Sequence, residues 1–280
     1  PMNNALKKSI NQIFKIALQE DKTLKDISSK LLLNKKNINV EIRFKSNGVL
    51  CGTNIIDFIL KCYNKGLKAK WKYKDGSKIK KNTVVGIISG PSIYLISLER
   101  IILNFLQRLC GISTLTDQYV RKVKKGIKIL DTRKTIPGWR LLEKYAVKTG
   151  GGTNHRKDLK SSYLIKDNHI QVAGGIVKTL EIAKEALVVK NLEIEVSSIA
   201  ELKKALDYKP KVIMLDNFNV DNIKKSVQLI RMRTKSKIEV SGNVTIEKIN
   251  EIKNLDIDYI SVGKITHSAN FLDISMNVLK

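Results

Sequence analysis

Two neighbouring segments gather positively charged side chains around a break in the chain. The first, DTRKTIPGWR (131–140), sets two arginines and a lysine beside Asp131 and a Pro-Gly pair. The second, NHRKDLKSSYLIKDNH (154–169), repeats the pattern shortly afterwards. The planar guanidinium of arginine binds a carboxylate through two parallel hydrogen bonds, and lysine acts on phosphate as a mobile point charge. We therefore expect a site for an anionic ligand.

Acidic residues are expected on the other side of this site. Glu195 lies at the end of the apolar run LEIEV, and Asp216 ends KVIMLD. Either residue alone has a plain structural explanation, as half of a strand-end ion pair or as the cap of a helix. Together they suit a bound Mg²⁺, ribose hydroxyls or a positive charge that develops at carbon. The cationic half comprises Arg100, Arg133, Lys134, His155, Arg156 and Lys166.

Two glycine-containing turns are predicted to bind phosphate. They are SGN (241–243) and VGKITHS (262–268), each at the end of a predicted strand. Backbone N–H groups at such turns, leading into helix N-termini, cradle phosphate in many α/β barrels. This donor set predicts a sugar phosphate that carries pyrophosphate, together with a second ligand that carries more than one carboxylate.

The histidines lie in the same segments, but their pattern does not indicate zinc. No cysteine accompanies them, and no two are spaced i, i+4 on a predicted helix. We expect His169 to orient a loop, and His155 and His267 to line the pocket.

From residue 127 onward, short apolar runs alternate with amphipathic segments. Strands that are hydrophobic on both faces and alternate with helices indicate a parallel sheet covered by helices. No GxGxxG turn follows the first strand, which counts against a dinucleotide-binding sheet and favours an α/β barrel, whose C-terminal strand ends share one face. The expected strands are IKIL, SYLI, LEIEV, KVIML, KIEVS and DYISVG, and the expected helices span 178–189, 198–206, 219–232 and 245–252.

The N-terminal part is predicted to be a mixed layer of helices and strands joined to a long connecting helix. Leucine and isoleucine at helical spacing predict an amphipathic first helix over 3–19. A further helix is expected at 53–64 with Thr53 or Asn54 as its cap. The expected strands are 38–45, 67–73 and 83–90, and Pro91 opens a long helical segment through about residue 122.

The composition indicates a soluble cytoplasmic protein with a substantial core. The chain has 280 residues, of which 42% are hydrophobic. Its longest uncharged run, 82–98, is interrupted by glycine and proline and is too short to cross a membrane. No secretory leader is expected. The 3 cysteines have no metal-ligand spacing and suit a reducing compartment.

A net charge of +26 allows a second hypothesis, a polyanion-binding protein. Against it, aromatic residues are only 6% of the chain, and no basic run carries interleaved aromatics for base stacking. The lysines are spread along the whole chain and are accompanied by abundant isoleucine and asparagine, as an A/T-rich coding sequence would produce. We favour this compositional explanation for most of the charge and expect no nucleic-acid or membrane partner.

The chain resembles the quinolinate phosphoribosyltransferase family, also called nicotinate-nucleotide pyrophosphorylase (carboxylating). The matching motifs run in the family's order over nearly the whole chain, and the block at 131–170 is highly specific. The motifs are ERIILNFLQRLCGISTLT (99–116), DTRKTIPGWRLLEKYAVKTGGGTNHRKDL (131–159), LIKDNHI (164–170), LEIEV (192–196), IMLDNF (213–218), EVSGN (239–243) and ISVGKITHSA (260–269).

The resemblance implies a reaction and an architecture. Quinolinate and phosphoribosyl pyrophosphate would give nicotinate mononucleotide, pyrophosphate and CO₂, with Mg²⁺, on the de novo route to NAD. The implied fold is an N-terminal α/β sandwich domain plus an open, TIM-like α/β barrel, in a homodimer or higher oligomer with shared sites. We place the sandwich domain and its connecting helix at 1–113, the barrel at 114–270, and a C-terminal helix that returns toward the first domain at 271–280.

The resemblance also implies roles for individual residues. Arg133, His155, Arg156 and Lys166 would hold quinolinate, Arg100 would reach in from the partner subunit, and Lys134 would contact pyrophosphate or carboxylate. Glu195 and Asp216 would bind ribose hydroxyls and metal, and Lys134, Lys166, Glu195 and Asp216 form the catalytic set. Ser241, Gly242, Gly263 and His267 would hold the 5′-phosphate.

Four positions depart from the family pattern. Ser161 and Ser197 stand where acids are usual, Asp158 replaces a glycine, and Cys110 replaces a serine. A sister group linked to molybdenum transport shares the DTRKT block, so another carboxylate or base is an alternative substrate. The presence of both NHR and the ERIILNFLQRL helix favours quinolinate.

Overall fold

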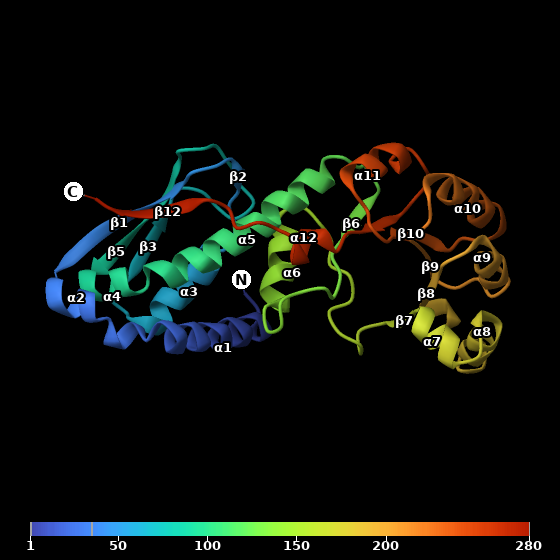
Figure 1. Cartoon of the computed structure of the whole chain (residues 1–280), viewed down its shortest axis with the longest axis horizontal. Coiled ribbons are helices and arrows are strands. Elements are labelled where there is room, and N and C mark those ends of the chain that lie inside the picture. The colour runs from blue at the N-terminus through green and yellow to red at the C-terminus, as the bar shows by residue number, and fades with distance from the viewer. Residues whose placement is uncertain (1, 35, 280) are drawn as a thin grey trace. The chain divides into compact units, whose positions relative to one another are not determined.

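The chain, described here by a computed structural model over residues 2–34 and 36–279, forms two compact units (Figure 1). The second unit consists of residues 118–133 and 152–263, and the first contains the described residues of 1–117, 134–151 and 264–280. Residues 134–151 and 264–270, which the sequence analysis assigned to the barrel, therefore belong to the first unit together with the C-terminal segment.

An antiparallel sheet with the strand order β12-β1-β5-β3 is the framework of the first unit. Val40 of β1 lies opposite Ile88 of β5, and both side chains are fully buried. The strands predicted at 38–45, 67–73 and 83–90 are confirmed. The strands are β1 (Asn37–Phe44), β3 (Lys68–Trp71), β5 (Val84–Pro91) and β12 (Ile274–Val278), while β2 (Gly48–Val49) pairs separately with β4 (Lys78–Ile79).

The predicted C-terminal helix over 271–280 is wrong. Residues Ile274–Val278 form β12, which runs antiparallel to β1 with Ile274 opposite Phe44. Ile274 and Met276 are buried, which is the two-residue alternation of a strand with one buried face. Pairing with β1 supplies hydrogen-bond partners for this backbone. Residue 280 lies outside the described residues.

Helices cover this sheet and carry the long connection to the second unit. In α1 (Asn4–Asp21), Leu6, Ile10 and Phe14 are buried, and the side chain of Asn3 accepts from the Leu6 amide (2.9 Å). The long helical segment expected after Pro91 is divided near Leu98 into two helices. The helices are α2 (Ile27–Leu32), α3 (Thr53–Tyr63), α4 (Ser92–Ser97), α5 (Glu99–Val120), α6 (Arg140–Thr149) and α12 (Lys264–His267).

The cap of α3 differs from the prediction. Its N-cap is Gly52, at φ 111°, and not Thr53 or Asn54. The carboxylate of Asp75 accepts from the amides of Gly52 and Thr53 (3.0 Å each) and from the phenol of Tyr145 (2.6 Å). A distant side chain therefore satisfies the free N–H groups of this helix start.

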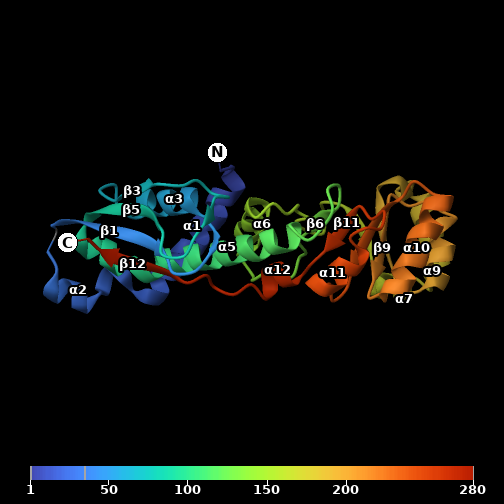
Figure 2. The same ribbon diagram turned by 90° about the horizontal axis from the view of Figure 1, so that it is seen from above.

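The second unit is a parallel sheet of six strands in the order β6-β11-β10-β9-β8-β7. Every strand predicted after residue 127 is confirmed, and the described sheet has β6 and β7 as its two end strands, as in an open barrel. The helices α9 and α10 lie on one side of β9 (Figures 1 and 2). The strands are β6 (Lys128–Leu130), β7 (Tyr163–Ile165), β8 (Leu192–Val196), β9 (Val212–Asp216), β10 (Lys237–Ser241) and β11 (Tyr259–Ser261), and the helices are α7 (Asp167–Val172), α8 (Ile176–Glu185), α9 (Ile199–Leu206), α10 (Val220–Arg233) and α11 (Ile246–Ile252).

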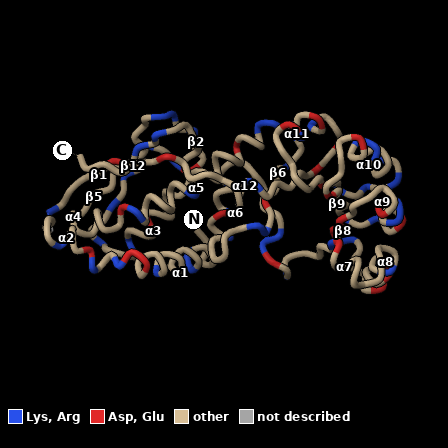
Figure 3. The backbone as a smooth tube through the Cα atoms, in the orientation of Figure 1, with Lys and Arg blue, Asp and Glu red and all other residues tan. Residues whose placement is uncertain are grey.

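Basic residues occur throughout both units and are not confined to one segment (Figure 3). This distribution agrees with the compositional explanation of the net charge. None of the helices in the described chain combines the length and the hydrophobicity needed to cross a membrane.

Candidate active site

Neighbouring strands of the second unit end in polar residues. These residues lie along the carboxyl-terminal ends of the parallel strands, which we call the carboxyl edge of the sheet. Asp216, the last residue of β9, lies opposite Ser241, the last residue of β10. Glu195 of β8 lies opposite Met214 of β9. Because the strands are parallel, their carboxyl ends share this edge. The predicted site residues in this unit are Arg133, His155, Arg156, Lys166, Glu195, Asp216, Ser241, Gly242 and Gly263.

Lys166 and Glu195 form an ion pair between the ends of β7 and β8. The Nζ of Lys166 lies 2.6 Å from Oε2 of Glu195, and the two side chains are 44% and 9% exposed. The amide of Lys166 donates to Nδ1 of His169 (3.1 Å), so His169, which was expected to orient a loop, lies in α7 and caps the start of that helix. The ammonium is thus held in place by a buried carboxylate while nearly half of the side chain remains accessible to a ligand.

Asp131 joins the two cationic segments. Its fully buried carboxylate accepts from the amide of His155 (2.8 Å), and its own amide donates to the carbonyl of Thr153 (3.2 Å). Thr153 also forms an isolated parallel bridge with Leu130 of β6. These bonds hold the NHR motif beside the DTR motif, which explains why an acid stands among the cations.

Arg133 and Arg156 bring like charges close together. The pKa of Arg156 is lowered, first by burial and then by the positive charge of Arg133, whereas the charge of Glu193 acts in the opposite direction. Two guanidinium groups that repel each other in a half-buried position are stabilised when an anion binds between them. A ligand with two carboxylates fits this arrangement.

Both ring nitrogens of His155 are engaged by the protein. Its Nδ1 accepts from the amide of Arg156 (2.8 Å), and its Nε2 lies 3.1 Å from Glu193 and 3.5 Å from Glu239. Burial alone would lower the pKa of His155, but hydrogen bonds to the two glutamates outweigh that effect and raise the pKa, because they stabilise the proton on Nε2. Burial raises the pKa of Glu239, which also accepts from Ser261. The His155 ring is therefore positioned to fix the backbone at Arg156.

Sequence reasoning missed Glu193 and Glu239. The signal was the two-residue period of a strand, which places Glu193 on the same face of β8 as Glu195. Within the described chain, His155, Glu193 and Glu239 form the one group of three with metal-ligand spacing. A metal at Nε2 would require the ring proton on Nδ1, where the Arg156 amide already donates a proton. This group therefore does not fit a metal ion.

The turn after β10 has the backbone of an anion-binding loop. Gly242 and Asn243 both have positive φ, at 83° and 44°, and consecutive unusual conformations of this kind turn N–H groups toward one point. A Cβ at Gly242 would collide with the side chain of Asn217. Asn217 in turn donates to Asp216 (2.7 Å), so the acid and the turn are held together.

The remaining predicted residues, Arg100, Lys134 and His267, belong to the first unit. Arg100 is exposed on the first turn of α5. The hydroxyl of Thr266 donates to the carbonyl of Lys134 (2.8 Å), which ties Lys134 to the α12 segment that carries His267.

The two serines noted as departures from the family pattern both form hydrogen bonds to acids. The hydroxyl of Ser161 donates to Asp158 (2.5 Å), three residues earlier. Ser197 donates to Glu201 through both its amide (2.8 Å) and its hydroxyl (2.9 Å). Both serines therefore lie within hydrogen-bond distance of a carboxylate.

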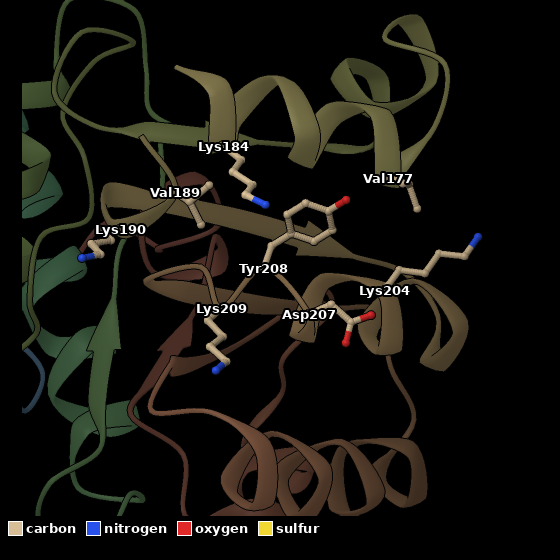
Figure 4. A pocket seen from close by; sticks show the side chains of 8 residues that line it. All are labelled: Val177, Lys184, Val189, Lys190, Lys204, Asp207, Tyr208 and Lys209. Atoms are coloured by element: carbon tan, nitrogen blue, oxygen red, sulfur yellow. The ribbon is translucent and has the colours of Figure 1, made fainter. Parts of the chain in front are cut away.

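A hollow of about 580 Å³ lies away from the strand-end site, at the amino-terminal side of β8 and β9 (Figure 4). Tyr208 stands among lysine side chains that include Lys184 and Lys204. Its residues come from α8, α9 and the segments that lead into β8 and β9, at the amino-terminal side of those strands. The hollow is thus separate from the strand-end site.

The chain matches the two domain families of one enzyme. The quinolinate phosphoribosyl transferase N-terminal domain matches residues 26–110, and the C-terminal domain matches residues 112–277. A Bacillus subtilis protein named probable nicotinate-nucleotide pyrophosphorylase (carboxylating) is 38% identical over 275 residues, which cover 98% of this chain and 93% of the relative. A chloroplastic nicotinate-nucleotide pyrophosphorylase (carboxylating) of Arabidopsis thaliana is 37% identical, covering 96% of this chain and 82% of the relative.

Solved structures of such proteins share the fold. The nicotinate-nucleotide pyrophosphorylase of Francisella tularensis aligns with a TM-score of 0.89 at 35% identity, covering 98% of this chain and 97% of that one. The protein of the same name from Ehrlichia chaffeensis aligns with a TM-score of 0.89 at 37% identity, covering 96% and 98%.

Proposed function

The chain belongs to the quinolinate phosphoribosyltransferase family, and we propose that the strand-end site of its second unit carries out the family's reaction. The enzyme transfers the phosphoribosyl group of phosphoribosyl pyrophosphate to quinolinate with decarboxylation, giving nicotinate mononucleotide, pyrophosphate and CO₂ in NAD biosynthesis. The site assignment is supported by Arg133 lying close enough to Arg156 to lower its pKa, and by an accessible Lys166 paired with Glu195 at the strand ends.

Positively charged side chains held in fixed positions would reduce the electrostatic repulsion between the two anionic substrates. Quinolinate carries two carboxylates and its partner carries several phosphate charges, so the substrates repel each other. Arg133 and Arg156 would hold the carboxylates. Lys166, held in position by Glu195, would contact the same ligand. Groups already oriented in a poorly hydrated pocket stabilise such charges without further reorganisation.

The acids Glu195 and Asp216 would act at the sugar. Loss of pyrophosphate leaves positive charge at the anomeric carbon, which nearby carboxylates stabilise. Nitrogen attack makes the ring a pyridinium, and this cation accepts the electron pair left by departing CO₂. His155 would contribute by holding Arg156 in position, because both of its ring nitrogens already have protein partners.

A Mg²⁺ ion fits the same two acids. Oε2 of Glu195 is paired with Lys166 and Oδ2 of Asp216 accepts from Asn217, so each carboxylate keeps one oxygen for a hard cation. Such ions are commonly bound by one or two carboxylates together with substrate phosphates. Bound there, Mg²⁺ would neutralise charge on the pyrophosphate leaving group.

The proposal includes a homodimer in the cytoplasm. The exposed Arg100 at the start of α5 would enter the partner's site, and the phosphate contacts of Lys134 and His267 are proposed as the resemblance implies them. The thiols of Cys51, Cys62 and Cys110 are free, which suits a reducing compartment.

The pair of Lys166 and Glu195 provides a direct test of the proposal. We expect Lys166→Met and Glu195→Gln each to lower kcat/KM for quinolinate by about 10- to 100-fold, since each removes a charged contact. The double variant should lose far less than the product of the single effects, because the two groups contact each other. Lys160→Met, an exposed lysine of the preceding loop, is the control. Fully multiplicative losses in a pyrophosphate-release assay would show that the two residues do not act as a pair.

A further inference from the structure

Lys248 occupies an unusual place for a surface-helix lysine. It lies in the first turn of α11, where its amide donates to the capping hydroxyl of Thr245 (3.3 Å). Its side chain folds back so that Nζ donates to the carbonyl of Gly242 (3.3 Å) in the turn after β10. The ammonium is therefore directed toward the carboxyl edge of the sheet and not toward solvent.

The surroundings of Lys248 do not satisfy its charge. Burial lowers its pKa, and the charge of Asp216 opposes this effect without reversing it. Within the described chain, Lys248 forms no ion pair at a distance of 4 Å or less. A half-buried ammonium with only a carbonyl partner is stabilised when an anion arrives.

The turn contacted by Lys248 is itself suited to an anion. Gly242 and Asn243 both have positive φ, the kind of backbone that forms anion-binding concavities. On the other side, the Asn217 amide donates to the carbonyl of Ser241 (3.2 Å), which fixes the end of β10 against β9. A side-chain cation and a turn with two positive φ angles therefore lie side by side at the end of β10.

We propose that Lys248 binds the terminal phosphate of the sugar-phosphate substrate, at the end remote from pyrophosphate. The inference rests on the proposed function for the identity of the full substrate, but the chemistry it requires is only that of a sugar monophosphate. On binding, Nζ moves from the Gly242 carbonyl to a phosphate oxygen and forms a charge-assisted hydrogen bond. Lys248 thus adds a specificity contact to the backbone cradle.

The test measures ligand binding as well as turnover. Lys248→Met removes the charge and keeps the length of the side chain. It should raise KM for phosphoribosyl pyrophosphate about 10- to 100-fold, the effect of losing a hydrogen bond to a charged group, while KM for quinolinate stays within about threefold. Lys248→Arg should recover most of the loss. Lys253→Met, at the other end of α11, is the matched control and should behave as wild-type.

Calorimetric titration separates this inference from the proposed function. Ribose 5-phosphate should bind Lys248→Met about 10- to 100-fold more weakly than wild-type, while pyrophosphate with Mg²⁺ binds both alike. That result supports the inference even if the wild-type protein forms no product from quinolinate, which would contradict the proposed function alone. The inference would be overturned if ribose 5-phosphate bound both proteins with equal affinity, or if it did not bind wild-type. It would also be overturned if Lys248→Met lowered only the affinity for pyrophosphate.

Discussion

Replacing Arg156 by alanine is expected to lower kcat/KM for quinolinate by about 30- to 1000-fold, which corresponds to about 2–4 kcal/mol. Arg156 is half-buried and close enough to Arg133 for their charges to repel. In the enzyme without substrate, this repulsion raises the free energy of the protein, and the bound dianion removes it. Loss of one arginine therefore destabilises the quinolinate complex far more than it destabilises the enzyme without substrate.

The character of the side chain matters as well as its charge. Arg156→Lys keeps the charge but loses the planar fork, so we expect it to recover only part of the activity. KM for phosphoribosyl pyrophosphate should change by less than about threefold in both variants. Steady-state kinetics with each substrate varied in turn measures both effects. A larger change toward phosphoribosyl pyrophosphate than toward quinolinate would place Arg156 at the wrong ligand.

Replacing Arg108 by methionine is expected to destabilise the protein by about 3–5 kcal/mol. Arg108 and Glu143 form an ion pair at 2.6 Å, with side chains only 7% and 0% exposed. Arg108 also donates to the carbonyls of Thr266 (2.5 Å) and Ala269 (3.0 Å), so it ties α5 and α6 to the α12 segment. Its removal leaves a buried carboxylate without its cation.

The stability lost in Arg108→Met should increase as the pH rises. Burial raises the pKa of Glu143 above its ordinary value, and Arg108 pulls it back. Without Arg108 the folded-state pKa rises further, so the folded protein holds a proton that the unfolded chain releases. Stability of Arg108→Met should therefore fall as pH rises from about 5 to 8. Urea unfolding at several pH values measures this slope.

A matched double variant distinguishes the ion pair from simple packing. Arg108→Met with Glu143→Leu removes both charges and should regain most of the lost stability, because no buried charge remains. If the double variant is no more stable than Arg108→Met alone, the buried carboxylate is not the cause of the loss.

The strands of the second unit were predictable because each is a short run rich in isoleucine, valine or leucine between polar turns. Their shared edge followed from parallel pairing alone, and it gave the positions of Glu195, Asp216 and Ser241. The strand β12 was not predictable in the same way, since its conformation depends on pairing with β1 at the other end of the chain. A short apolar run can form either a helix or a strand, and here pairing with the distant strand β1 stabilises the strand.

The contacts that position the site depend on distances that a sequence does not contain. Asp75 caps α3 from 22 residues away, although two nearer residues are good capping types. Glu193 and Glu239 come from strands that are not neighbours in sequence and meet at His155. The types of the substrate-facing residues could be inferred, but the network that holds His155 required coordinates.

We propose that Arg133, Arg156 and Lys166 together allow two anionic substrates to react. The measurement is the formation of nicotinate mononucleotide by the purified protein, with wild-type and Arg133→Ala compared at equal concentration. We expect wild-type to release one pyrophosphate for each nicotinate mononucleotide, only when quinolinate is present, and Arg133→Ala to be at least about 100-fold slower. Equal rates for the two proteins, or pyrophosphate release that does not require quinolinate, would contradict the account.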